Sequence, residues 1–163
     1  ELFHDLLDVH RLAPEWGKLL EAAAYLHDAG HYVSDTRHHK HSFYLVANSD
    51  LPVFTDRERM LVAHLCRYHR KSPPAALHAG FQALPAEDRR AVELLIPLLR
   101  LADALDRGGH QIVERAAISA RGGEAELRLT ASVDPDLEIW AAERVSELFR
   151  EAYGKTLVVA RDR

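Results

Sequence analysis

The spacing of apolar residues changes once along this chain of 163 residues, at Gly108–Gly109. Before this point apolar residues recur every three or four positions, the period of an amphipathic helix. After it, residues 112–120 and 125–131 have the composition of strands around a glycine turn, and the second run alternates apolar and polar side chains. A helix is expected between Asp134 and Gly154, and a last strand over residues 156–160. The sequence therefore predicts a mostly α fold with a small C-terminal α/β unit of β-β-α-β order.

The change of period also suggests a domain boundary. We expect a helical domain over residues 1–110 and a small α/β subdomain over residues 111–163, because the length suffices for one domain with a satellite. The chain opens inside an apparent helix, with no capping residue before Leu2. We therefore expect it to be a piece of a longer protein.

The overall charge limits the classes of partner. The formal net charge is −4 and the isoelectric point is near 6.3, which argues against general binding of nucleic acid or of membrane surfaces. No apolar run reaches the roughly 18 to 20 residues of a membrane span. A single cysteine, Cys66, cannot form an intramolecular disulfide, so we expect a reducing, cytoplasmic setting.

Turn and capping residues set the expected helix boundaries. Pro14 suits the first turn of a helix, and Thr55 to Glu58 has the form of a capping box. Pro85 starts the longest expected helix, in which Pro97 predicts a kink because it removes a backbone donor. Residues 31–37 are expected to form a loop, and residues 75–84 an irregular connection that can include one helical turn.

Four of these helices share an apolar stripe that finishes in polar side chains. The terminal residues are His27 with Asp28, His41, His69, and Asp103 with Asp106. Burial of an unpaired carboxylate costs several kcal/mol, so such groups are expected to pair with one another or with a metal. Seven of the eleven histidines also lie between positions 27 and 69.

The first functional interpretation is a divalent metal held by His27, Asp28 and Asp103. Mixed imidazole and carboxylate ligands suit manganese, iron or zinc, and three protein ligands leave room for an activated water. The alternative is a hydrogen-bonded His–Asp pair that caps the core and binds nothing. Both interpretations remain open at this level.

A second polar cluster is basic and comprises residues 37–41 and 67–71. Guanidinium, ammonium and imidazole donors are what a phosphate chain or a nucleotide needs. The alternative is a solvated run of surface charge. Cys66, on an apolar face, is interpreted as a core residue.

Five ordered blocks then identify a resemblance. They are residues 26–30 (LHDAG), 39–45 (HKHSFYL), 48–52 (NSDLP), 67–71 (RYHRK) and 99–107 (LRLADALDR). Together they closely resemble the C-terminal part of exopolyphosphatases and guanosine pentaphosphate phosphohydrolases, an HD-type helical domain followed by a small α/β tail. The resemblance covers nearly the whole chain.

The resemblance implies a division of labour with other domains. In this family the phosphohydrolase centre lies in N-terminal domains of the actin-like ATPase fold, and the full-length enzyme is expected to use Mg²⁺. The C-terminal part is implied to bind polyphosphate or a phosphorylated nucleotide and to help form a homodimer. The basic residues that match are His41, Arg67, His69, Arg70 and Lys71.

The same resemblance implies a metal set of a first histidine, the His–Asp pair and a distal aspartate. His27, Asp28 and Asp103 match the last three positions. The first histidine is expected upstream of Glu1, because His4 lies too close to the break at residues 11–14.

Two functional hypotheses follow. In the first, the chain is the substrate-binding and dimerising C-terminal fragment of an exopolyphosphatase-like enzyme and is inactive alone. In the second, it is an independent metal-dependent HD-type phosphohydrolase that acts on a nucleotide or phosphoester. A helical interaction module ranks last, since it leaves the inward polar cluster unexplained.

Overall fold

The computed structural model describes residues 1–162, which form two compact units. One unit is a single stretch, Ala13–Leu99, and is entirely helical. The other combines Glu1–Leu12 with the chain from Arg100 onward and contains the sheet. The first twelve residues thus belong with the C-terminal unit. The domain boundary between residues 110 and 111 stays a prediction.

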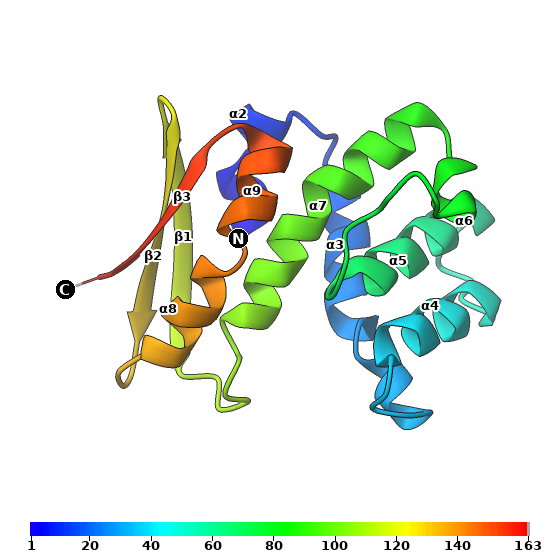
Figure 1. Cartoon of the computed structure of the whole chain (residues 1–163), viewed down its shortest axis with the longest axis horizontal. Coiled ribbons are helices and arrows are strands. Elements are labelled where there is room, and N and C mark those ends of the chain that lie inside the picture. Colours follow the sequence, from blue (N-terminus) through cyan, green and yellow to red (C-terminus); the bar gives the residue numbers. More distant parts are fainter. Residues whose placement is uncertain (163) are drawn as a thin grey trace. The chain divides into compact units, whose positions relative to one another are not determined.

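The helical unit contains five α-helices and one short 3₁₀ helix within its described residues. They are α3 (Glu15–Leu26), η1 (Ala29–Tyr32), α4 (His38–Asn48), α5 (Asp56–Tyr68), α6 (Ala79–Gln82) and most of α7 (Ala86–Ala104). Helix α5 packs against both α3 and α4, and η1 packs against α4 (Figure 1). The most buried part of α5 runs from Leu61 to Cys66, where every side chain is inaccessible or nearly so. Helix α5 is therefore the centre of this unit.

The predicted capping box at the start of α5 is confirmed. The backbone N–H of Glu58 donates to Thr55 Oγ1 at 3.2 Å, and the N–H of Thr55 donates to Glu58 Oε2 at 2.8 Å. The reciprocal pair satisfies two donors that a helix start leaves unpaired. The capping box thereby fixes the residue at which α5 begins.

An acidic residue in the first turn of α7 has a further role. Asp88 is fully buried and forms a two-point ion pair with Arg57 of α5, one contact of which is Arg57 Nε to Asp88 Oδ2 at 2.9 Å. Guanidinium and carboxylate match each other in this fork geometry. The pair joins the starts of α5 and α7 within the helical unit.

The other unit is built on a three-stranded mixed sheet in the order β1-β2-β3. Strand β1 (Val113–Arg121) pairs antiparallel with β2 (Glu124–Ala131), and β2 pairs parallel with β3 (Thr156–Arg161). Helices α8 (Asp136–Glu143) and α9 (Ser146–Tyr153) supply the crossover between the parallel strands and pack against β3 (Figure 1). A parallel pair needs such a crossover. The mostly helical fold with a small β-β-α-β unit is confirmed.

Two details of this unit differ from the sequence prediction. The single helix expected between Asp134 and Gly154 is interrupted, because the N–H of buried Val145 bonds the carbonyl of Ala142, three residues back, in a tighter turn than an α-helix. The first helix is also two short ones, α1 (Leu2–Asp5) and α2 (Leu7–His10).

The edge of β1 is covered by α1. Asp5 Oδ2 accepts the backbone N–H of Ile118 at 3.0 Å, and α1 packs against β1, in which the side chain of Ile118 is buried. An edge strand with free donors invites pairing with other chains. The carboxylate of Asp5 occupies one of these donors.

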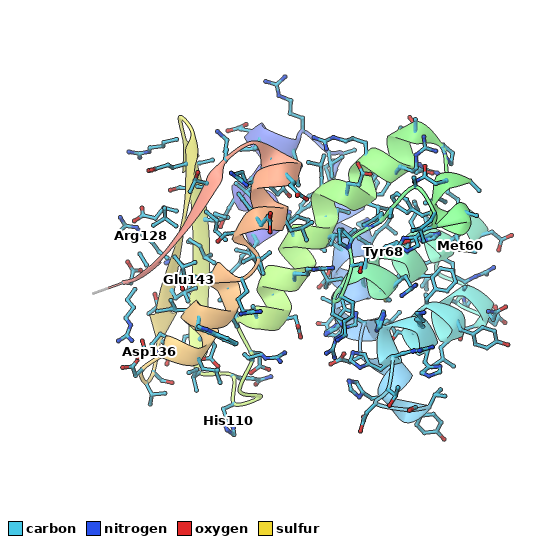
Figure 2. The ribbon with its side chains drawn as sticks, in the orientation of Figure 1. Met60, Tyr68, His110, Arg128, Asp136 and Glu143 are labelled. Atoms are coloured by element: carbon cyan, nitrogen blue, oxygen red, sulfur yellow. The ribbon has the colours of Figure 1, made fainter. Side chains whose placement is uncertain are left out.

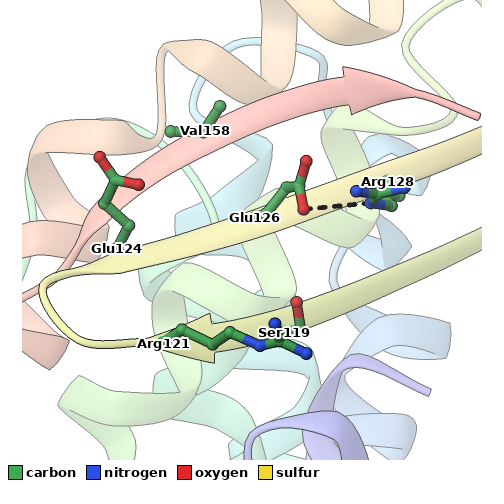
Figure 3. Close-up of a pocket in the computed structure, with 6 residues that line it drawn as sticks. All are labelled: Ser119, Arg121, Glu124, Glu126, Arg128 and Val158. Carbon is green, nitrogen blue, oxygen red and sulfur yellow. Dashed lines mark hydrogen bonds and ion pairs between the residues drawn. The ribbon is translucent and has the colours of Figure 1, made fainter.

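The opposite, solvated face of the sheet carries a shallow hollow (Figure 3). Its lining is mostly charged, with side chains of both signs, and consists of Ser119, Arg121, Glu124, Glu126, Arg128 and Val158. Arg128 and Glu126 form an ion pair at 3.1 Å across it. Mixed, self-paired charge is what a half-exposed sheet normally presents to water.

In the described part of the chain, no helix is both long and apolar enough to cross a membrane.

Candidate metal and phosphate site

The His–Asp pair lies where α3 gives way to a tight loop. Helix α3 ends at Leu26, His27 is its C-terminal cap, and η1 begins at Ala29. The loop is tied to α4 through Ser42, whose hydroxyl donates to the carbonyl of His27 at 2.5 Å and accepts the N–H of Gly30 at 2.8 Å. Ser42 is completely buried.

Gly30 is required by this close approach. A Cβ at this position would lie 2.0 Å from the carbonyl oxygen of His38 and 2.5 Å from the backbone nitrogen of Ser42. Only glycine lets the two backbones come so near each other. The loop that carries Asp28 is therefore held directly on the first turn of α4.

Four imidazoles surround the carboxylate of Asp28. Its Oδ1 lies 3.2 Å from Nε2 of His38, 3.5 Å from Nε2 of His69 and 3.6 Å from Nε2 of His31. Its Oδ2 lies 3.6 Å from Nε2 of His27. Nε2 of His38 and Nε2 of His69 are themselves 3.2 Å apart. The ring nitrogens of four segments thus converge on one carboxylate.

The other ring nitrogen of each imidazole faces an acceptor. Nδ1 of His27 meets the carbonyl of Ala24 at 2.8 Å, and Nδ1 of His69 meets the carbonyl of Cys66 at 2.7 Å. A carbonyl oxygen can only accept, so these Nδ1 atoms carry the proton and donate. In the Nδ1–H tautomer of each ring, Nε2 is the acceptor nitrogen, and it lies near the carboxylate of Asp28. This is the arrangement of histidines that bind metals.

His31 and His38 follow the same rule. Nδ1 of His31 donates to Oδ1 of Asp35 at 2.7 Å, and Nδ1 of His38 faces the carbonyl of Asp35 at 3.4 Å. Their rings are stacked, with centroids 3.7 Å apart. Two donor groups in the described chain have the spacing of metal ligands: His27, Asp28 and His69, and Asp28, His31 and His38.

Burial lowers the pKa of two adjacent histidines of α4, His38 and His39, and so favours their neutral form. The pKa of His38 lies below its ordinary value, first because of burial and second because of the nearby His31. Burial and the charge of Arg67 lower the pKa of His39 to about 4. A neutral imidazole is the form that coordinates a metal.

The predicted phosphate-binding residues are spread around this centre. Nη1 of Arg70 is exposed and lies 3.4 Å from both ring nitrogens of His38, which places it over the ring face. Arg67 and His41 are half-buried, and Lys71 is exposed with a positive φ of 62°. His69, by contrast, is buried with its Nε2 beside Asp28. The phosphate role of these residues stays a prediction.

The turn after α5 presents the basic residues. The hydroxyl of Tyr68, labelled in Figure 2, donates to Nδ1 of His78 at 3.1 Å, and the same Nδ1 accepts the N–H of Ala75 at 3.1 Å. Tyr68 is buried and stacks on His64. The chain from Arg70 to His78 is thereby fastened back onto α5.

The third predicted metal ligand, Asp103, belongs to the other compact unit, and so does His4. Burial lowers the pKa of the Arg100 guanidinium below its ordinary value, and the nearby Asp103 carboxylate opposes part of this effect. The set of His27, Asp28 and Asp103 as metal ligands stays a prediction.

Sequence reasoning did not single out His31 and His38 as candidate metal ligands. His31 lies three residues after Asp28, which brings the two side chains together in a turn, and this spacing was the available signal. His38 was grouped with the basic residues around it. Its burial depends on how the loop of Gly30 meets α4, which no periodicity reveals.

Comparison with known proteins agrees with this class of helical domain and small sheet. Residues 1–142 match the family described as Ppx/GppA phosphatase, domain III. The chain therefore belongs to the Ppx/GppA phosphatase family, in the region of its domain III.

Two curated relatives carry the name guanosine-5'-triphosphate,3'-diphosphate pyrophosphatase. The one from Vibrio vulnificus (strain YJ016) is 29% identical over 142 residues, which are 85% of this chain and 27% of the relative. The one from Pseudoalteromonas translucida (strain TAC 125) is 33% identical over 85 residues, 52% of this chain and 16% of the relative. The chain thus spans about a quarter or less of each relative's length.

Proposed function

We propose that this chain is the part of a Ppx/GppA-family phosphatase that binds the phosphate groups of a polyphosphate chain or a phosphorylated nucleotide. The observation that carries the proposal is the position of Arg70, exposed and over the ring of His38, beside the imidazoles that surround Asp28. Guanidinium groups recognise phosphate oxygens, and a divalent metal at the His–Asp centre, with His27 and Asp28 contributing and Asp103 as a further ligand, would add a second positive charge.

The rest of the activity is assigned to other parts of a longer protein. The relatives named above are several times longer than the matched region. Hydrolysis is proposed to take place, with Mg²⁺, in N-terminal domains of the actin-like ATPase fold. The chain itself is proposed to bind substrate, to dimerise and to be inactive alone on polyphosphate. Sedimentation analysis tests the dimer, and a monomer at all concentrations would contradict it.

Binding of tripolyphosphate and of guanosine tetraphosphate tests the main proposal. Titration calorimetry at several salt concentrations should show affinity that falls steeply with salt, because phosphate binding releases counterions. Arg70→Gln with Lys71→Gln should weaken binding about tenfold or more. Arg115→Gln, an exposed arginine of β1, serves as the matched control. Binding that is absent, or that ignores both salt and the double variant, would contradict the proposal.

The second candidate is an independent metal-dependent phosphohydrolase of the HD type. It is favoured by the convergence of metal-type donors on Asp28, since three protein ligands can leave a position for an activated water. Phosphate release from nucleotides and simple phosphoesters, with Mn²⁺, Fe²⁺ or Zn²⁺, tests it. Activity should be lost on His27→Ala and Asp103→Ala. A chain that retains no metal and releases no phosphate would exclude this candidate.

A further inference from the structure

The rings of His31 and His38 and the guanidinium of Arg70 form a short stack beside Asp28. The two rings are inclined by 27°, with their centroids 3.7 Å apart. Nη1 of Arg70 lies 3.4 Å from both ring nitrogens of His38 and is therefore over a face of that ring. Because one face has no room for both neighbours at these separations, Arg70 and His31 lie on opposite faces of His38. The stack ends in Arg70 on one side and in His31 on the other.

The outward end of this stack is the second face of the His31 ring. The first face is covered by His38. The two ring nitrogens lie beside carboxylates, Nδ1 at 2.7 Å from Oδ1 of Asp35 and Nε2 at 3.6 Å from Oδ1 of Asp28. The side chain of His31 is nevertheless 42% exposed. Since one face and both nitrogens have neighbours, the exposed surface is mainly the second face, a flat aromatic surface that its neighbours hold in place.

A second aromatic ring, Tyr32, follows His31 directly in η1. Its side chain is 96% exposed, the highest value among the exposed large hydrophobic residues of the described chain. A phenol ring in water is stabilised when a flat, largely apolar group covers it. Because almost none of its surface is packed, the side chain of Tyr32 can rotate toward a ligand that lies on the neighbouring ring of His31. The loop thus offers two aromatic surfaces to a planar group.

The charges around the stack differ between its two ends. Residues 36–49 and 66–86, which include the start of α4 and the end of α5, contain five arginine and lysine residues and no aspartate or glutamate. The carboxylates of Asp28 and Asp35 lie at the edge of the His31 ring. A phosphate group is therefore attracted toward Arg70 and repelled from the edge of His31. This arrangement suits a ligand with a planar group at one end and phosphates at the other.

A nucleotide has these two parts at a suitable separation. A base stacked on His31 at about 3.4 Å, the spacing of stacked bases, lies roughly 10 Å along the stack from the Arg70 guanidinium. The ribose and the phosphates that follow it can span this length. A bare polyphosphate chain has no group that fits the aromatic end.

We propose that His31 and Tyr32 bind the base of a phosphorylated nucleotide by stacking, while Arg70 binds its phosphates. This inference rests on the proposed phosphate-binding function, and of the two ligands left open there it selects the nucleotide over the bare polyphosphate chain. Stacking on aromatic rings depends little on which base is bound, because every base has a flat face. Tyr32 is then the residue that distinguishes nucleotides from base-free phosphates.

The first experiment uses the unaltered chain with adenosine triphosphate, guanosine triphosphate and tripolyphosphate, which share a run of three phosphates. Titration calorimetry at one salt concentration should show that both nucleotides bind about tenfold more tightly than tripolyphosphate, since only they add a stacked base. Nuclear Overhauser effects should connect the base protons to the ring protons of His31 and Tyr32. Effects that connect the base to Tyr25 or Tyr44 instead, two other exposed tyrosines, would overturn the assignment.

The second experiment removes the exposed ring. Tyr32→Ala should weaken the binding of both nucleotides about fivefold to tenfold and leave tripolyphosphate binding unchanged, because only the aromatic surface is lost. Tyr32→Phe keeps the ring and should bind all three ligands like the unaltered chain. Tyr44→Ala, at another exposed tyrosine of the helical unit, is the matched control. Neither alanine substitution removes core packing, and equal losses for the two would overturn the assignment.

The outcomes separate the base site from the phosphate-binding proposal. If nucleotides and tripolyphosphate bind equally and Tyr32→Ala changes neither affinity, the base site is wrong and phosphate binding stands. If Tyr32→Ala weakens nucleotide binding while tripolyphosphate does not bind and Arg70→Gln with Lys71→Gln has no effect, the base site holds and the phosphate function fails. If none of the three ligands binds, both are wrong.

Discussion

Gly30 is the residue on which the position of Asp28 most directly depends. Its missing side chain allows the loop to touch the backbone of α4, with Ser42 bonded to both ends of the loop. Because a Cβ would lie 2.0 Å from the His38 carbonyl, Gly30→Ala has to push the two segments apart. We expect a loss of about 1–3 kcal/mol in the free energy of unfolding.

Urea denaturation measures this loss. Gly80→Ala is the matched control, since its Cβ would meet no atom within 4 Å and its backbone is helical. There alanine should stabilise the chain slightly, by up to about 1 kcal/mol. Equal effects of the two substitutions would show that the loop contact is unimportant.

His64 gives the helical unit a dependence on pH that is separate from the metal centre. It lies on α5 among Phe43, Tyr68 and Phe81, and burial, with a smaller effect from Arg67, lowers its pKa to about 4. The unfolded chain binds the proton near pH 6.5, so stability is full above pH 6.5 and falls as the pH drops toward 4. The loss is on the order of 3 kcal/mol.

Urea denaturation from pH 7 to pH 4, with chelator present, measures this loss. His64→Phe should make the curve less steep between pH 6.5 and 4 than that of the unaltered chain, while His38 and His39, whose pKa values are also lowered, keep part of the slope. His110→Ala, exposed in the other unit, should leave its slope unchanged. A slope that is the same with and without His64 would contradict the assignment.

At the scale of elements, the ion pair between Arg57 and Asp88 joins α5 to α7. Arg57→Met leaves the fully buried carboxylate of Asp88 without its partner, which should cost roughly 2–3 kcal/mol in the free energy of unfolding. Replacing both residues, with Asp88→Leu, should recover part of this loss. Arg128→Gln breaks a solvent-exposed pair and should cost under about 1 kcal/mol. Similar losses for the two single variants would contradict the buried pair.

Element boundaries were predictable where the chain carries local signals. The capping box at Thr55 and the glycine turn between β1 and β2 fixed their elements closely. The break between α8 and α9 was not predictable, because no glycine or proline marks it and the tight turn depends on the burial of Val145. Local sequence thus predicts where a helix or strand starts and ends better than it predicts a break within a helix.

The candidate site was predictable in part for the same reason. His27, Asp28 and His69 end apolar stripes, and the structure places all three in one metal-spaced group. His31 and His38 lie in a segment rich in histidine, where apolar spacing cannot tell which ring faces inward. The contact of the Gly30 loop with α4 determines which of these rings is buried.

At the scale of the whole molecule, the two compact units predict where a bound metal is felt. His27 and Asp28, two of the proposed metal ligands, lie in the Ala13–Leu99 unit. A divalent metal at about 100 times its dissociation constant should stabilise that unit by about 2.7 kcal/mol. Hydrogen exchange should therefore slow at the amides of α3, α4 and α5, and remain unchanged in β1, β2 and β3. Slower exchange around Asp103 as well would support Asp103 as a further ligand.

The helical unit interrupts the other unit in the sequence, since residues 1–12 pack with the chain after residue 100. During synthesis the stretch from Ala13 to Leu99 therefore has all of its own contacts before the sheet exists. The contacts between α1 and β1 form only after β1 has emerged from the ribosome. The order of translation therefore lets the His–Asp centre form before the sheet unit.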